Sequence, residues 1–99
     1  MLWLWNLCAI TYLKELDLLL LNQLISTRGI VDIEIYGVSN YDLAKYIENN
    51  LNFDQLILEC WDGIDPNSGW VHVSYVNENA NRKDVLTYTR ENGYTKGII

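Results

Sequence analysis

The strictest alternation of hydrophobic and polar residues in the chain lies at residues 70–75, which read WVHVSY. Successive side chains of a β-strand point to opposite faces, so Trp70, His72 and Ser74 share one face and the two valines share the other. The stretch is therefore predicted to be a strand with its valines in the core. His72, the only histidine in the sequence, then projects from the opposite face.

Other segments also have strand character. Residues 31–35 (VDIEI) alternate in the same way, which places Asp32 and Glu34 opposite the valine and the isoleucines. Residues 53–61 (FDQLILECW) are predicted to form a buried strand, and residues 84–89 (DVLTYT) a further one. Strands therefore account for most of the second half of the chain.

Two segments favour helix. Residues 2–25 are rich in Leu and Trp and contain neither Gly nor Pro, and the leucines from Leu18 onward are expected to be buried on the sheet. In residues 40–51, apolar residues recur at three- and four-residue spacing after a capping residue at Ser39 or Asn40. These two helices would flank the predicted strands.

The order helix, strand, helix and then three strands predicts an α+β fold with a small, mostly antiparallel sheet and flanking helices. Asn92-Gly93 adds a hairpin turn near the end of the chain. Ninety-nine residues are enough for one small core. Most of the tryptophans fall in predicted strands or in the first helix and are expected in that core.

The charge balance narrows the choice of partners. A formal net charge of -6 argues against nucleic acid and against anionic membranes, because both attract Lys/Arg-rich surfaces. The apolar start, residues 1–13, is shorter than the roughly 20 residues of a membrane span. It also lacks the basic start and the cleavage site of a signal peptide. We expect no membrane span, and production in the cytoplasm is plausible.

The positions of Asp32 and His72 suggest chemistry. Each points away from the apolar residues of its own strand, so two strands of one sheet would bring a carboxylate and an imidazole together. Both groups are good zinc ligands. The alternative is that His72 is only a hydrogen-bonded residue of the surface or core, and periodicity leaves both open.

Three motifs follow in a fixed order within residues 29–86: FDQLI, SGWVHVSY and NRK. They resemble the C-terminal part of the zinc D-Ala-D-Ala carboxypeptidase family, which includes VanY-like and phage endolysin-type murein peptidases. The resemblance implies a hydrolase that cuts peptidoglycan stem peptides with zinc-activated water. Residues 29–99 would form the murein zinc-peptidase-like domain, and residues 1–28 a divergent N-terminal helical segment.

The resemblance also implies a metal site. The family takes a His-Asp-His set from an S-x-H-x-x-G-x-A-x-D motif and a later W-V-H-V-S strand. Carried over, Asp32 and His72 are metal ligands. The first histidine's place falls on Ile25, or on Ser26 if Gly29 is matched to the motif glycine. That ligand is missing from this sequence, so a weak or partial zinc site is expected.

The catalytic base is the second departure from the family. Many relatives carry an acidic residue three positions before the second histidine, where this chain has Gly69. Glu59, on the LILEC strand, is the candidate base. The alternative is that Glu59 is a structural hydrogen-bond partner.

The sequence thus favours an enzyme-like domain, a zinc metallopeptidase of D-Ala-D-Ala carboxypeptidase or murein endopeptidase type that is incomplete or weakly active. Its cofactor would be zinc and its partner a peptidoglycan peptide. The alternatives are a non-catalytic peptide- or cell-wall-binding module and a gene fragment. Arg82, in the NRK motif, is expected to pair with a carboxylate rather than to bind an anion.

Overall fold

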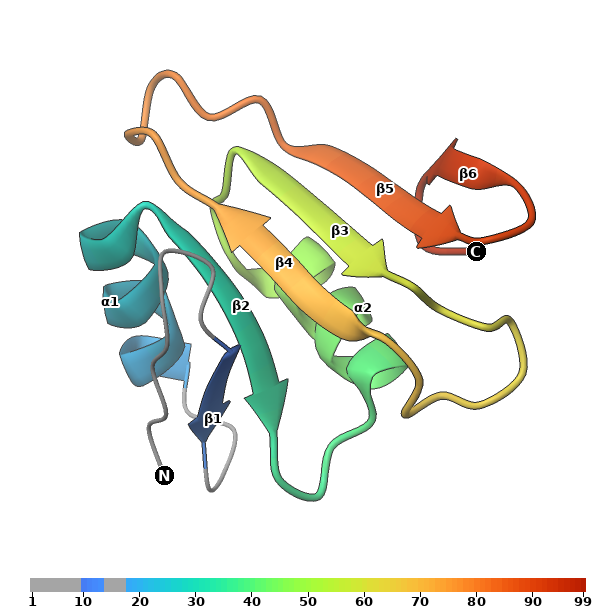
Figure 1. Cartoon of the computed structure of the whole chain (residues 1–99). Helices are drawn as coiled ribbons and strands as arrows, with labels where there is room; N and C mark the ends of the chain where they lie inside the picture. Colours follow the sequence, from blue (N-terminus) through green and yellow to red (C-terminus); the bar gives the residue numbers. More distant parts are fainter. Residues whose placement is uncertain (1–9, 14–17) are drawn as a thin grey trace.

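The computed structural model describes residues 10–13 and 18–99, with side chains from residue 18 onward. The elements in chain order are β1 (Ile10–Leu13), α1 (Leu18–Arg28), β2 (Ile30–Ile35), α2 (Asn40–Asn50), β3 (Gln55–Glu59), β4 (Trp70–Ser74), β5 (Asp84–Thr89) and β6 (Gly93–Lys96). The described strands form one sheet in the order β1-β2-β4-β3-β5-β6 (Figure 1).

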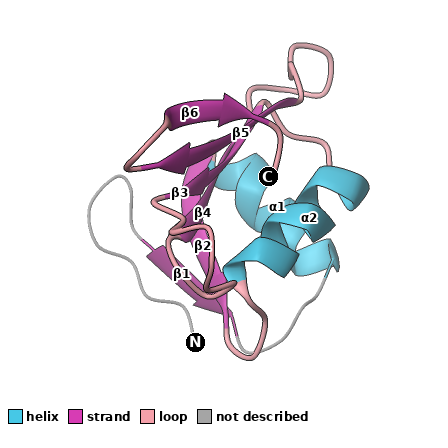
Figure 2. Cartoon of the chain, turned by 90° about the vertical axis from the view of Figure 1, so that its right-hand side faces the viewer, coloured by secondary structure: helices cyan, strands magenta, loops and turns pink. Residues whose placement is uncertain are grey.

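The sheet is mostly antiparallel. The pairs β2/β4, β3/β4 and β5/β6 are antiparallel, whereas β1/β2 and β3/β5 are parallel. Both helices cover the same face of the sheet (Figure 2). The predicted α+β fold with a mostly antiparallel sheet and flanking helices is therefore confirmed. No helix in the described part of the chain has the length and apolarity that a membrane crossing requires.

The core lies between the helices and the sheet. Strand alternation turns one set of residues toward the helices, because each strand places every second side chain on the same face. The core residues are Leu21, Ile25, Val31, Ile33, Ile35, Leu43, Ala44, Ile47, Leu51, Phe53, Leu56, Leu58, Val71 and Val73.

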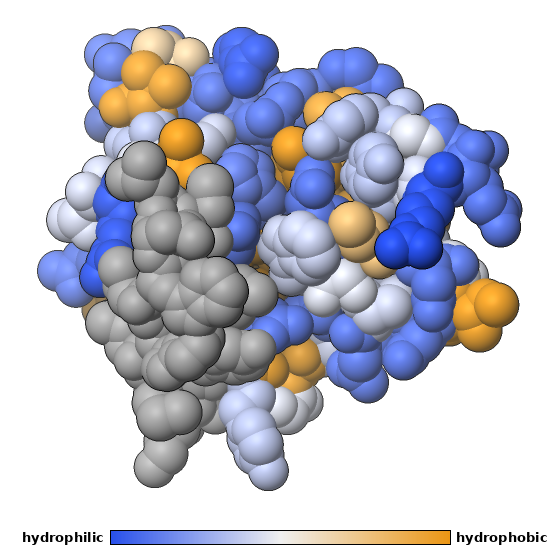
Figure 3. Space-filling model, in the orientation of Figure 1, coloured by the Kyte–Doolittle hydropathy of each residue, from blue (hydrophilic) through white to orange (hydrophobic). Residues whose placement is uncertain are grey.

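The opposite face of the sheet carries mostly polar side chains, and we call it the polar face. Its polar members in β2 to β5 are Asp32, Glu34, Gln55, Glu59, His72, Ser74 and Asp84. Figure 3 views the molecule from this side, and hydrophobic residues occupy only small separate groups of its coloured surface. The alternation in residues 31–35 and 70–75 predicted this division correctly.

The N-terminal region differs from its predicted helix. Residues 10–13 form β1, which pairs with β2 in parallel, with Ile10 opposite Asp32. Ile, Thr and Tyr in this stretch favour extended backbone, and pairing with β2 outweighs the absence of helix breakers. The helix begins only at Leu18, and the remaining residues of the predicted helix, 2–9 and 14–17, lie outside the described residues.

Helix α1 buries a single stripe. Leu21 and Ile25 are fully enclosed by the core, as expected, whereas Leu19 is 78% exposed. Residues four apart lie on the same side of a helix, so only part of a leucine run can face the sheet. The expectation that the whole run is buried was therefore wrong for Leu18 and Leu20, which are 41% and 45% exposed, as well as for Leu19.

Helix α2 matches its prediction closely. The Ser39 hydroxyl caps it by accepting a hydrogen bond from the backbone N–H of Asp42 at 3.1 Å. Leu43, Ala44 and Ile47 are buried against the sheet, in agreement with the three- and four-residue spacing. The helix ends at Asn50, and Leu51 turns the chain back toward β3.

Arg82 pairs with a carboxylate, as predicted from the sequence. The guanidinium donates to Asp54 from Nε at 3.0 Å and from Nη2 at 2.9 Å, and the Arg82 backbone N–H adds a third bond at 3.1 Å. The side-chain hydrogen bonds from Arg82 lower the pKa of Asp54 below its ordinary value. This pair ties the β4–β5 connection to the start of β3.

We expect Arg82→Met to weaken the dependence of stability on pH. A lowered carboxyl pKa contributes stability above the unfolded-state pKa of about 3.9, and this stability is lost as the pH falls through the folded-state pKa. Urea unfolding at pH 7 and pH 3 should show a smaller difference between the two pH values in the variant. Arg82→Lys, which keeps the charge without the paired donors, is the control. An unchanged pH difference in Arg82→Met would contradict this role.

Candidate metal site and adjoining cleft

Asp32 and His72 meet on the polar face. They are directly opposite in the β2/β4 register, and His72 Nδ1 lies 2.8 Å from Asp32 Oδ1. Their neighbours in both strands point into the core, so parity leaves the imidazole and the carboxylate on the other side. The expected approach of the two side chains is therefore observed, and their role as metal ligands stays a prediction.

The pair is sheltered but accessible. Asp32 is 6% exposed, and the His72 side chain retains 22% of its accessible surface. When Nδ1 carries the proton it donates to Asp32, and a metal ion bound by both side chains would take the place of that proton, between Nδ1 and the carboxylate. A carboxylate that holds an imidazole in this way fixes both its ring orientation and its tautomer.

The described residues around the pair do not complete a metal site. Ile57 of β3 lies directly opposite His72 on the side away from Asp32, and it is 6% exposed. Over residues 10–13 and 18–99, no three His, Cys, Asp or Glu side chains form a group that could hold a metal ion. Catalytic zinc sites use three protein ligands. Asp32 and His72 alone therefore do not fit a catalytic zinc ion.

The two places where the family's first histidine would fall lie on α1. Ile25 is buried in the core, and the exposed Ser26 hydroxyl donates to the carbonyl of Gln23 at 3.3 Å. Helix α1 covers the face of the sheet opposite Asp32 and His72 (Figure 2). A ligand at either position would be separated from the pair by the sheet itself.

Glu59 lies on the polar face, one pair further along β3. It is opposite Trp70, whereas Ile57 is opposite His72. Glu59 and His72 are therefore diagonal neighbours, for which a separation of about 7–8 Å is typical. The negative charge of Glu59 raises the pKa of Tyr94 on β6. Glu59 thus interacts electrostatically with Tyr94, and its role as a catalytic base stays a prediction.

Gly69, at the position of the family's acidic residue, has a steric role. Its φ is +70°, and a Cβ atom there would overlap the carbonyl oxygen of Glu59. Glycine lets the β3–β4 connection re-enter the sheet in close contact with the backbone of β3. This backbone has no room for a side chain at position 69.

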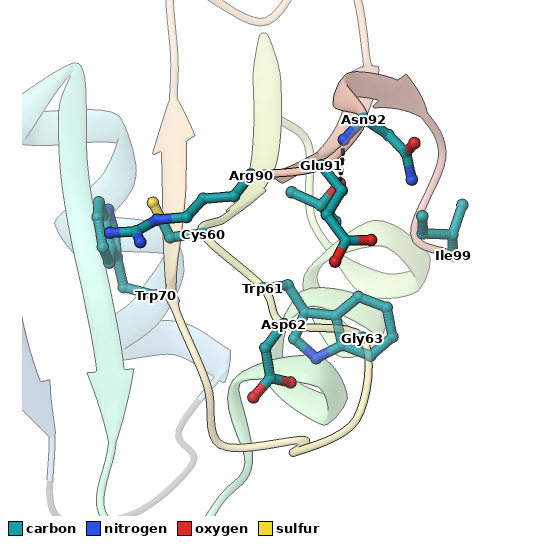
Figure 4. A pocket seen from close by; sticks show the side chains of 10 residues that line it. Cys60, Trp61, Asp62, Gly63, Trp70, Arg90, Glu91, Asn92 and Ile99 are labelled. Atoms are coloured by element: carbon teal, nitrogen blue, oxygen red, sulfur yellow. Dashed lines mark hydrogen bonds between the residues drawn. The ribbon is translucent and has the colours of Figure 1, made fainter.

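A cleft of about 980 Å³ lies next to the pair, at the end of the sheet (Figure 4). It runs between the β3–β4 connection and the β5–β6 turn, and Trp70 in its wall is two residues from His72 on the same face of β4. The lining residues are Cys60, Trp61, Asp62, Gly63, Trp70, Thr89, Arg90, Glu91, Asn92 and Ile99.

This cleft was not predicted from the sequence. Most tryptophans were expected in the core, yet Trp61 and Trp70 both line the cleft. Trp61 also packs against the core, and its ring centroid lies 5.3 Å from that of Tyr41. The sequence feature that indicated a cleft was the pair of tryptophans on either side of a turn-rich loop. Nothing in the sequence indicated that residues 89–92, the second wall, lie next to that loop.

The pair and the cleft are thus defined by the residues of this chain alone. Comparisons of the chain with protein-family models, with curated proteins and with solved structures find no match.

Proposed function

We propose that the chain is a zinc-peptidase-like domain that binds peptidoglycan stem peptides, holds zinc weakly and hydrolyses murein poorly. One observation carries the proposal: His72 and Asp32, 40 residues apart in the sequence, lie at hydrogen-bond distance on one face of the sheet. They are the two residues that the FDQLI, SGWVHVSY and NRK resemblance assigns to the metal. A chance likeness in sequence would not require these two side chains to meet.

Weak zinc binding follows from the number of donors. Asp32 and His72 supply two, and each missing protein ligand lowers the affinity of a site whose binding energy comes from several ligands held together. Position 69 carries no acid, and the base that we propose in its place is Glu59. Slow hydrolysis is therefore the expectation for this polypeptide.

A non-catalytic peptide-binding module is the second candidate. The adjoining cleft favours it, because the cleft has the size of a small-ligand site and does not depend on a metal ion. The two candidates share the ligand and differ in whether bond cleavage follows binding.

Zinc content and murein hydrolysis test the proposal together. We expect substoichiometric, loosely held zinc by mass spectrometry of the purified protein, and slow release of soluble peptides from isolated murein. His72→Ala and Asp32→Asn should lower both signals, because each removes one of the two donors. Glu78→Gln, in the exposed β4–β5 connection, is the matched control and should change neither.

Two outcomes would refute the proposal. Full zinc occupancy with rapid hydrolysis in the unmodified protein would show that the site is complete. Zinc binding that survives both His72→Ala and Asp32→Asn would show that the metal, if bound, lies elsewhere.

A further inference from the structure

One wall of the cleft is held in place by the chain itself. Asp62 Oδ1 accepts hydrogen bonds from the backbone N–H groups of Ile64 and Asp65, both at 2.8 Å, and from the Ser68 hydroxyl at 3.1 Å. These bonds lower the pKa of Asp62. Trp61 Nε1 donates to the carbonyl of Asp65 at 3.2 Å. Oδ1 of the Asp62 carboxylate is therefore held by its own loop, and the indole of Trp61 is fixed.

The opposite wall carries two charged side chains that have no hydrogen-bond or salt-bridge partner among the described residues. Within residues 10–13 and 18–99, neither Arg90 nor Glu91 forms a side-chain hydrogen bond or salt bridge, and both are exposed. Figure 4 shows the Arg90 side chain extended toward Trp70, while the Glu91 carboxylate lies on the side of Trp61. A cation and an anion are thus presented to one cleft, which two indole rings also line.

This arrangement specifies a ligand by its chemistry. A guanidinium binds a carboxylate with paired, charge-assisted hydrogen bonds, and a carboxylate binds an amine. The indole rings offer flat apolar surface to the side chains between the two charged groups. Glu91 and the overall charge of -6 disfavour a polyanion.

We propose that the cleft binds a short zwitterionic peptide, with its free carboxylate on Arg90 and its amine at Glu91. Naming this ligand a peptidoglycan stem peptide rests on the proposed function, because a stem peptide with a diamino residue and a terminal alanine carries both groups. Trp70 and His72 are two residues apart on one face of β4, which corresponds to about 6.6 Å along a strand.

The test compares three probes in the presence of a chelator, so that zinc has no part in binding. The probes are Nα-acetyl-Lys-D-Ala-D-Ala, its C-terminal amide and its Nε-acetylated form, measured by calorimetry and by tryptophan fluorescence. We expect the amide and the Nε-acetylated form each to bind about tenfold or more weakly, since each loses a charge-assisted contact. Arg90→Gln should abolish the preference for acid over amide and retain the preference for the free amine. Glu91→Gln should do the reverse.

Arg28→Gln is the control. Arg28 ends α1 on the face of the sheet opposite the polar face, so this variant should bind all three probes as the unmodified protein does. No binding of the free peptide would overturn the assignment. It would also fail if Arg90→Gln kept the preference for acid over amide, or if only a neutral N-acetylglucosamine oligosaccharide bound.

His72→Ala separates the two proposals: we expect it to lose zinc and hydrolysis but to bind the peptide normally. If no variant or probe shows zinc binding or hydrolysis while peptide binding persists, the zinc-peptidase proposal fails and the cleft assignment stands.

Discussion

Replacement of Gly69 by alanine is expected to lower the free energy of unfolding by about 3 kcal/mol or more. Two costs add. A residue with a Cβ is strained at φ +70°, and the new methyl group would overlap the Glu59 carbonyl oxygen and lie 3.0 Å from the carbonyl carbon of Cys60. These contacts are with backbone at the last β3/β4 pair, which cannot retreat without breaking that pair.

Gly63→Ala is the matched control. Gly63 lies in the same connection with φ +84°, but nothing lies within 4 Å of the position of its Cβ. Only the conformational cost remains, about 1 kcal/mol. Urea unfolding followed by circular dichroism should therefore separate the two variants clearly. Equal stability of Gly69→Ala and Gly63→Ala would show that the close approach to Glu59 does not exist in solution.

This steric requirement bears on the chemistry of the site. An aspartate or glutamate at position 69, which the resemblance expects, would meet the same backbone atoms as alanine. An acidic residue at position 69 would require a different path of the β3–β4 connection. Among the described residues, Glu59 on β3 and Glu34 on β2 are the acidic diagonal neighbours of His72 on the polar face.

Strand parity explains why the Asp32–His72 pair could be predicted from the sequence. In a strand, a shift of one residue moves every side chain to the other face, so burial of the valines and isoleucines determines where Asp32 and His72 point. The clear alternation in 31–35 and 70–75 was therefore sufficient to predict both strands and their shared polar face.

The parts that were missed depend on contacts between distant residues. Residues 10–13 have no alternation, and their strand forms because β2 offers an edge for pairing. The cleft needs the connection around Trp61 to meet the turn at Arg90, and local patterns carry no information about which loops adjoin. The sequence also did not reveal on which side of the sheet Ile25 and Ser26 lie. Both are on α1, which covers the face opposite the polar face.

That geometry predicts where a third ligand would work. Ile57 flanks His72 on β3 as Asp32 flanks it on β2, so the three positions form one row across three adjacent strands. Directly opposite residues have Cβ atoms about 4.5–5.5 Å apart, close enough for imidazole and carboxylate groups to share one ion. We expect Ile57→His to bind zinc at least about tenfold more tightly than the unmodified chain, and close to stoichiometrically.

Two controls isolate the cause. Ile57→Asn removes the same buried isoleucine without adding a strong zinc ligand, so it should share any loss of stability and gain no zinc affinity. Ser26→His adds the same imidazole at a position the resemblance suggests, but on α1, and it should leave zinc affinity unchanged because the sheet separates it from His72. Zinc titration of the three folded variants shows which position supplies a third ligand. A gain from Ser26→His equal to that from Ile57→His, or no gain from a folded Ile57→His, would mean that Asp32 and His72 do not offer their donors on the polar face. A gain confined to Ile57→His would identify the polar face as the face on which Asp32 and His72 can hold zinc.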